Sequence, residues 1–346
     1  MSTGTGPSTG TGPNTGTSPS TGTSRATGAH WAASPVVVRA PATSANLGPG
    51  FDAVGLALAL HDVVEARVTG GGLAMEVSGE GTETAGAGER HLVVRAMRAA
   101  FSLLGGQPPG IALRCVNAVP HGRGLGSSAA AIVTGVLAAR GLVSDGVTML
   151  TDDGVFRLAV ELEGHPDNVA ACLAGGLTIA WTAQRGAGGA AVPRLAKLTV
   201  LDGICPVVCV PQEVLSTETA RRVLPETVPH GDAAANAGRS ALLIAGLTSV
   251  PEVLFDATED FLHQRYRAAV MPATADLLRR LRAGGLAAVV SGAGPAVLVL
   301  TGPGPKTSPD LVDSIARETG IPWRISPLGV DRYGATLQTA VPGVRP

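Results

Sequence analysis

Lysine, aromatic residues and long apolar runs are all scarce in this sequence of 346 residues. Lysine occurs only at positions 197 and 306, aromatic residues make up 3% of the chain, and charged residues make up 15%. The 26 basic and 27 acidic side chains nearly cancel, which excludes a broad basic surface for nucleic acid. No run approaches the ~18 apolar residues that span a bilayer. We therefore expect neither a nucleic-acid-binding nor a membrane protein.

Cysteine is also sparse, with four residues at positions 115, 172, 205 and 209. None forms a C-x-x-C pair, and no histidine-rich neighbour supplies the spacing of a zinc site. This pattern predicts free, buried thiols. The first residues lack the basic start and apolar stretch of a secretion signal, so we expect a cytoplasmic protein.

The N-terminal segment has almost nothing apolar to bury. Residues 2–25 read as four six-residue repeats, STGTGP, STGTGP, NTGTSP and STGTSR. Such a composition cannot offset the entropy lost on ordering, so we expect residues 1–34 to be a disordered tail. The folded chain is expected to begin near Pro35, which leaves enough residues for one large or two modest domains.

The remaining sequence mixes short β-branched runs with segments of helical periodicity, without strict βαβ alternation. The pattern predicts an α+β protein with two lobes, over residues 35–203 and 204–346. Strands are expected at 36–39, 62–69, 73–78, 111–119, 176–183, 206–210, 286–291 and 296–300, with a final strand near the C-terminus and a Gly/Ala-rich turn at 186–191. Helices are expected at 90–104, 127–140, 152–163 (capped by Thr151), 216–223, 233–248, 255–262, 274–283 and 309–318.

Two glycine-rich segments, PATSANLGPGFD at 41–52 and VSGAGPAV at 290–297, could approach a ligand closely. In the first, Gly48 and Gly50 allow a path with positive φ, and Asn46 and Asp52 are the side chains with the clearest chemical potential. A structural turn with capping Asn and Asp is the alternative. The second segment joins two apolar strands, where a plain hairpin turn is the alternative.

A third glycine-rich segment, PHGRGLGSSAAA at 120–131, lies between a predicted strand and a predicted helix. This order aims backbone N–H groups and the positive end of the helix at one point, which suits phosphate. No lysine follows, so it is not a Walker A loop. Ser127 and Ser128 begin the helix, where one hydroxyl can cap the helix and the other can reach a metal or phosphate. An ordinary glycine-rich helix start is the alternative.

Carboxylates follow in the segment ELEGHPDN, at Glu161 and Glu163. Mg²⁺ typically takes one or two carboxylates together with phosphate oxygens. A magnesium site and a solvated helix end are equally compatible with this segment.

In their joint order and spacing, these segments resemble motifs of the GHMP kinases, whose phosphate loop P-x-x-x-G-L-G-S-S-A matches Pro120–Ala129. The match is closest to the members that phosphorylate L-homoserine. It covers the chain from Val36 onward, through Pro41–Asp52, Glu163–Val169, Ser216–Pro225, Tyr266–Pro272 (with Arg265 where the motif has proline) and Ser291–Pro295. The resemblance implies a two-lobed GHMP kinase fold, with an N-terminal ATP-binding domain, a C-terminal domain, and nucleotide and substrate in the cleft between them.

The same resemblance implies a reaction and a set of residues. The reaction is Mg²⁺-ATP-dependent phosphorylation of the side-chain hydroxyl of L-homoserine, a step of threonine biosynthesis, by a protein that is a homodimer in many members. Ser128 would bind the metal with Glu161 or Glu163, of which we favour Glu161. The residues implied to hold ATP are Pro120, His121, Gly122, Arg123, Gly124, Leu125, Gly126, Ser127, Ser128, Ala129 and Ala130. Those implied to bind the amino acid are Asn46, Asp52, His165, Thr217, Arg221 and Arg267.

A catalytic base is harder to assign. Asn168 stands where some GHMP kinases have a catalytic aspartate, and neither lysine lies in a motif. Our hypothesis is that Asn46, Asp52 or Asn168 aligns the substrate hydroxyl and that the γ-phosphate or water takes its proton. A GHMP kinase of mevalonate, shikimate or a sugar is one alternative, and a non-catalytic nucleotide-binding regulator is another.

Overall fold

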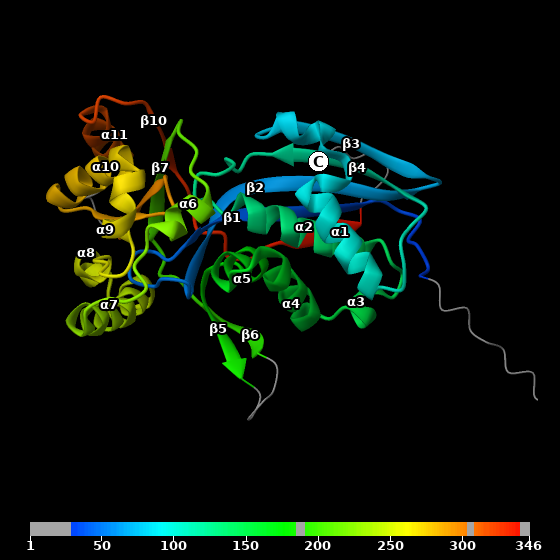
Figure 1. The fold of residues 1–346 in the computed structure, drawn as a ribbon, viewed down its shortest axis with the longest axis horizontal. Helices are drawn as coiled ribbons and strands as arrows, with labels where there is room; N and C mark the ends of the chain where they lie inside the picture. The colour runs from blue at the N-terminus through cyan, green and yellow to red at the C-terminus, as the bar shows by residue number, and fades with distance from the viewer. Residues whose placement is uncertain (1–28, 185–190, 303–307, 340–346) are drawn as a thin grey trace, which may run out of the picture.

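Two β-sheets, each with its own helices, organise the protein, which the computed structural model describes over residues 29–184, 191–302 and 308–339. The first sheet has seven strands in the order β11-β1-β2-β4-β3, and β5 pairs with both β2 and β6. The second has four strands in the order β10-β7-β9-β8. Figure 1 shows the first sheet and its helices at the right and the second at the left. The predicted two-lobed α+β architecture is confirmed.

The N-terminal lobe contains most of the predicted elements. Its strands are β1 (Val36–Ala45), β2 (Val54–Thr69), β3 (Gly72–Gly79), β4 (Gly110–Asn117), β5 (Leu177–Gln184), β6 (Ala191–Leu198) and β11 (Thr336–Thr339). Its helices are α1 (Leu92–Leu103), α2 (Ser127–Gly141), α3 (Gly146–Met149), α4 (Asp152–Glu163) and α5 (Pro166–Ala174), with a 3₁₀ helix at Thr82–Arg90. Strand β6 and helices α3 and α5 were not predicted.

The C-terminal lobe covers its small sheet with helices. Its strands are β7 (Cys205–Pro211), β8 (Ala287–Val290), β9 (Val297–Thr301) and β10 (Trp323–Pro327). Its helices are α6 (Thr217–Arg222), α7 (His230–Thr248), α8 (Leu254–Ala257), α9 (Gln264–Arg267), α10 (Pro272–Ala283) and α11 (Pro309–Arg317), with 3₁₀ helices at Pro251–Val253 and Ala268–Val270. The helix predicted over 255–262 is wrong in extent, because α8 ends at Ala257 and a turn precedes α9.

Helix α2 is the central helix of the N-terminal lobe. It is apolar all round, and residues 132–140 are buried without a break. Such a helix must be covered on every side, and α2 packs against β1, α1, α4 and α5. This burial holds the start of α2 in a fixed place at the boundary between the lobes (Figure 1).

One apolar cluster joins the two lobes. It contains Leu47, Leu56 and Leu125 from the N-terminal lobe and Val208 and Leu298 from the C-terminal sheet. The cleft between the lobes therefore has a continuous core beneath it. None of the helices in the described ranges is long and apolar enough to cross a membrane.

Both ends of the predicted domain division need correction. Trp31 bridges Val143 and packs edge-on against Phe101 at 5.5 Å, so the fold begins before Pro35. At the other end, β11 pairs antiparallel with β1, so the last strand belongs to the N-terminal lobe and not to a domain over 204–346. Residues 1–28 lie outside the described residues, as does most of the predicted turn at 186–191.

Candidate active site

The three glycine-rich segments meet around one cavity. Ser291 Oγ donates to the Gly124 carbonyl at 2.6 Å and lies 2.8 Å from Ser44 Oγ, while the Gly292 amide donates to the Ala45 carbonyl at 3.0 Å. The cavity between them has a volume of about 130 Å³. It is lined by Asn46, Asp52, Gly122, Gly124, Gly126, Ser127, Ser128, Glu163, His165, Asp167, Asn168, Leu215, Thr217, Arg221, Arg267, Gly292, Ala293 and Gly294.

The loop before α2 requires its alternating glycines. Gly122, Gly124 and Gly126 have φ angles of 64°, 77° and 69°. A Cβ at Gly124 would lie 2.2 Å from the Ser291 carbonyl oxygen, and one at Gly126 would lie 1.9 Å from Thr43 Oγ1. No side chain caps α2, so the predicted capping hydroxyl is wrong and the first amides of the helix can face an anion.

Not every residue of this loop faces the cavity. Pro120, Leu125, Ala129 and Ala130 are buried and support the loop from beneath. Arg123 turns away and donates to the backbone carbonyls of residues 121, 211 and 212, which ties the loop to the end of β7. The part of the loop that faces this cavity is therefore made of the three glycines and two serines.

In the first glycine-rich segment, residues 41–52, the backbone is strained near its polar side chains. Strand β1 runs on to Ala45, and then Asn46, Leu47 and Asp52 adopt φ angles of 67°, 47° and 53°, which non-glycine residues rarely do. The Asn46 amide is fixed on both sides, because its Nδ2 donates to the Gly292 carbonyl and its Oδ1 accepts from the Asp52 amide, each at 2.8 Å. The predicted positive φ occurs at Gly48 but not at Gly50, which is small because a Cβ would meet the Val54 side chain.

Glu163, and not Glu161, faces the cavity. Ser128 Oγ donates to Glu163 Oε2 at 2.5 Å, while Glu161 is exposed and does not line the cavity. Two positions along a helix turn a side chain by about 200°, so only one of the two can face inward. The preference for Glu161 is therefore corrected. Burial raises the pKa of Glu163, the hydrogen bond from Ser128 opposes that rise, and nearby Asp167 adds to it.

Asp52 and Arg221 form an ion pair at the cavity wall. Arg221 Nη2 lies 2.6 Å from Asp52 Oδ1, and Nη1 lies 3.2 Å from Oδ2. Thr217, at the start of α6, and His165, between α4 and α5, line the same wall. Burial lowers the pKa of His165, and the charge of Arg221 lowers it further. The structure thus brings together all six residues expected to bind substrate.

Arg267 is buried, with 1% of its surface exposed. Its Nε donates to the Ala220 carbonyl at 3.2 Å, and its Nη1 contacts His263 Nδ1 at 2.9 Å and the Gly292 carbonyl at 3.1 Å. Burial, together with the charge of Arg221, lowers its pKa to about 10, so it stays cationic at neutral pH. Within the described ranges no carboxylate lies within ion-pair distance of Arg267, so this buried cation is met by neutral acceptors alone.

Two residues next to Asn168, Thr43 and Asp167, were not predicted to belong to the site. Asn168 Oδ1 accepts from Thr43 Oγ1 at 2.8 Å, which fixes the orientation of its amide toward β1. Asp167 lines the cavity with 2% exposure, and burial raises its pKa to about 6. An aspartate in the first turn of a helix that begins with proline usually serves the helix, so the sequence carried no signal of this burial.

A second cavity, of about 300 Å³, adjoins the first on the other side of Ser127 and Ser128. It is mainly apolar, and of its lining residues the sequence pointed only to His121, Ser127 and Ser128. Its buried polar atoms include His91 Nδ1 and Thr134 Oγ1, which have no hydrogen-bond partner among the described residues. The lining consists of Asp62, Val64, Thr84, Ala87, Arg90, His91, Leu92, Val93, Asn117, His121, Ser127, Ser128, Ala131 and Thr134.

Comparison with known proteins agrees with this geometry. Residues 91–176 match the GHMP kinases N terminal domain, and residues 241–321 match the GHMP kinases C terminal domain. The chain belongs to the GHMP kinase family. A homoserine kinase of Streptomyces coelicolor is 52% identical over 305 residues, which cover 88% of this chain and 95% of that protein. A homoserine kinase of Streptomyces avermitilis is 53% identical over 305 residues, with 88% and 96% covered.

Among solved structures, that of homoserine kinase from Cytophaga hutchinsonii superposes with a TM-score of 0.70. It is 23% identical and covers 88% of this chain and 98% of that chain, so this likeness shows the fold. The resemblance inferred from the motifs is thereby confirmed.

Proposed function

We propose that this protein transfers the γ-phosphoryl group of ATP to the side-chain hydroxyl of L-homoserine, giving O-phospho-L-homoserine for threonine biosynthesis. The observation that supports this substrate most strongly is the burial of the Arg267 guanidinium without an anionic partner in the part of the chain that the structure describes. A buried cation without an anionic partner costs free energy, and the carboxylate of an amino acid would supply that partner. Its Nη2 has no partner among the described residues and is the nitrogen left to face the substrate.

The opposite end of the substrate has its own acceptor. Asp52 carries the carboxylate that an ammonium group needs, and the Asn46 side chain oxygen fixes the backbone at Asp52. Mevalonate, shikimate and sugars have no ammonium group and would leave Asp52 with Arg221 as its cation, in the same ion pair as without substrate. The paired charges of Asp52, Arg221 and Arg267 therefore favour a zwitterion over the substrates of other GHMP kinases.

The nucleotide would use both cavities. Its phosphates would lie against the glycine loop and the first turn of α2, and its base and sugar would occupy the mainly apolar second cavity. Ser128 and Glu163 fit a magnesium ion, because their oxygens lie side by side at the phosphate end. Within the described residues no cluster of three acidic, histidine or cysteine side chains could hold a metal, so phosphate oxygens and water would complete the set.

In this proposal the residues that line the cavity align the reacting groups, and no lysine is among them. Phosphoryl transfer depends mainly on positioning and charge neutralisation. Asn168, whose Oδ1 is held by Thr43, can donate from its Nδ2 to the substrate hydroxyl. The γ-phosphate or a water would then take the hydroxyl proton. A consumer of ATP and an amino acid would act in the cytoplasm.

A coupled assay of ADP release with Mg²⁺-ATP tests this proposal. L-homoserine, mevalonate and shikimate are compared as acceptors, with Arg267→Ala prepared in parallel to expose any contaminating kinase. We expect turnover with L-homoserine alone, and its loss in the variant. Turnover with mevalonate or shikimate but not with L-homoserine would show that the proposed substrate is wrong. Absence of any acceptor-dependent turnover would favour a non-catalytic nucleotide-binding protein.

A further inference from the structure

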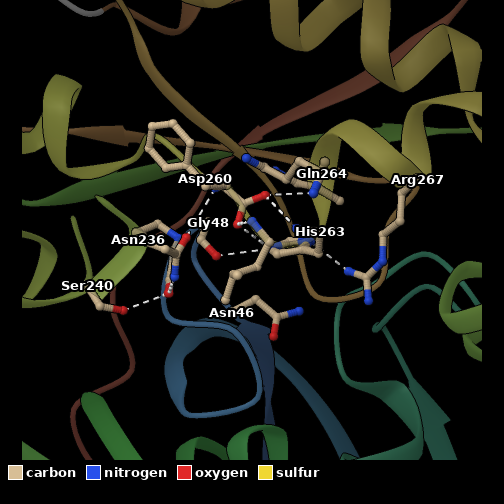
Figure 2. Close-up of polar contacts among 12 residues, drawn as sticks. Asn46, Gly48, Asn236, Ser240, Asp260, His263, Gln264 and Arg267 are labelled. Carbon is tan, nitrogen blue, oxygen red and sulfur yellow. Dashed lines mark hydrogen bonds and ion pairs between the residues drawn. The ribbon is translucent and has the colours of Figure 1, made fainter. Parts of the chain in front are cut away.

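His263 lies in the turn before α9, where this turn contacts the first glycine-rich segment (Figure 2). The Asp260 carboxylate accepts from the amides of the next residues, at 3.1 Å for Leu262, 3.0 Å for His263 and 2.6 Å for Gln264. These bonds fix the backbone that carries the imidazole. His263 has no exposed surface, so its ring contacts protein on every side.

Two hydrogen bonds fix the protonation of this ring. His263 Nε2 lies 2.9 Å from the Gly48 carbonyl, and Nδ1 lies 2.9 Å from Arg267 Nη1. A carbonyl only accepts and a guanidinium only donates, so Nε2 carries the proton and Nδ1 presents its lone pair. Burial lowers the pKa of His263, although the Asp260 carboxylate 3.6 Å from Nε2 opposes this shift, and the lowered pKa agrees with the neutral ring that the two partners require.

The two partners belong to opposite ends of the proposed substrate site. Gly48 follows Asn46 in the segment that ends at Asp52, on the ammonium side, while Arg267 is on the carboxylate side. The Phe51 ring of the same segment stacks on the imidazole, with ring centres 5.1 Å apart. It also lies 5.6 Å from the Arg267 guanidinium and 5.8 Å from that of Arg221.

Two other tethers of this segment, from α7, do not reach Arg267. Asn236 Nδ2 and Ser240 Oγ, both on α7, donate to the Pro49 carbonyl at 2.8 Å and 2.6 Å (Figure 2). They hold the segment from the other side. His263 differs from these two because it contacts both the segment and the buried arginine. The Gly292 carbonyl, which accepts from Asn46 Nδ2 and Arg267 Nη1, is a second link between them.

We propose that His263 is a positioning residue that sets the Arg267 guanidinium and the Gly48–Asp52 segment at a fixed separation, matched to the carboxylate and ammonium of one amino acid. This inference rests on the proposed function and assigns a specificity role to a side chain outside the cavity lining. The alternative is an imidazole that only fills the core, whose loss would affect all substrates equally.

Two substitutions separate the two hydrogen bonds. His263→Gln keeps a donor near the place of Nε2 for the Gly48 carbonyl but loses the acceptor for Arg267. His263→Asn keeps an acceptor near the place of Nδ1 but no longer reaches Gly48. Each is assayed with L-homoserine and with 3-aminopropan-1-ol, the same molecule without its carboxylate. Val312→Ala, a buried position on α11 in the core of the C-terminal lobe, controls for general loss of stability.

We expect His263→Gln to lower kcat/KM for L-homoserine about tenfold, as for a lost hydrogen bond to a charged group, with a much smaller effect on 3-aminopropan-1-ol. The preference for the carboxylate should therefore shrink. In His263→Asn, kcat/KM should fall for both acceptors and the preference should persist. Adding His263→Gln to Arg267→Ala should then have little further effect.

An equal loss for both acceptors in His263→Gln, or no loss for L-homoserine, would overturn the positioning role. If the Gln variant does not fold, the Asn variant decides, since a reduced carboxylate preference there contradicts the proposal. A wild-type protein without L-homoserine turnover would instead remove the proposed function itself, so the two failures are distinguishable.

Discussion

Arg221 Nη2 lies 2.6 Å from Asp52 Oδ1, and this ion pair joins two segments separated by 169 positions in the sequence. An α-amino acid carries the same two charges as this pair. Its ammonium would take Asp52, and its carboxylate would take Arg221 together with Arg267. The side chains that we propose to recognise the substrate thus bind one another by the same ionic contact.

Substituting Asp52 by Asn should weaken substrate binding more than chemistry. The variant keeps its size but loses the charge that faces the ammonium, so KM for L-homoserine should rise about tenfold or more. KM for ATP should stay within about twofold, because Asp52 belongs to the amino-acid end of the cavity. Steady-state kinetics over a range of pH checks this. A fall in kcat alone, with KM retained, would make Asp52 a base and not an anchor.

The two glutamates of α4 form a matched pair for the metal site. Glu163→Gln should lower kcat by about a hundredfold and weaken the dependence on Mg²⁺, because Glu163 lies beside Ser128. Glu161→Gln should leave both unchanged, because Glu161 is exposed on the other side of the helix. A magnesium titration of kcat measures both variants. The reverse result would restore Glu161 as the ligand.

Replacing Gly124 by Ala should disturb both stability and activity. The residue has φ +77°, and a Cβ would meet the carbonyl oxygen of Ser291, which is backbone and cannot swing away. The strain should cost at least about 1 kcal/mol and should lower kcat/KM for ATP. Gly238→Ala is the control, because nothing lies within 4 Å of its Cβ on α7. That variant should be slightly more stable, which urea unfolding measures.

Asp167 should make the protein less stable at neutral pH than its Asn variant. Burial raises the pKa of Asp167 from 3.8 to about 6, so the folded state binds this proton more tightly than the unfolded state. The protonated carboxyl stabilises the fold below pH 4, and this contribution is lost as pH rises to about 6. At pH 7 the free energy of unfolding of Asp167→Asn should therefore exceed that of the wild type by on the order of 2 kcal/mol. Near pH 4 the two free energies should differ little.

Equal stability of the two proteins across this pH range would contradict a buried Asp167 whose pKa is raised in the folded state. A variant that is more stable and less active would show that the charge at this position is retained for function.

The parts of the site that could be predicted are those written in local sequence. Glycines spaced by two before a helix and a serine pair at its start are local features, and they located a loop that lines the cavity. The same is true of the cap at Thr151, whose side chain accepts from Gly154 as expected. The phase of α4 would also have indicated Glu163, against our preference for Glu161, because Glu163 is four residues beyond buried Ala159 and Glu161 is four beyond exposed Arg157.

Features that depend on distant pairing could not be read in this way. Strand β11 returns to β1 across almost the whole chain, and no local pattern gives that register. His263 contacts Gly48, which precedes it by 215 positions. The residues around His263 in the sequence do not distinguish a histidine that joins two segments from one that only fills the core, because the difference depends on contacts with distant residues.

The most direct test of the account is ³¹P NMR of a reaction containing the protein, Mg²⁺-ATP and L-homoserine. The central claim is that the cavity directs phosphate to the substrate hydroxyl. The account predicts that the γ-phosphate signal of ATP is replaced by that of a phosphate monoester, split by coupling to the neighbouring CH₂ group. Appearance of inorganic phosphate alone, or no change in the ATP signals, would contradict it.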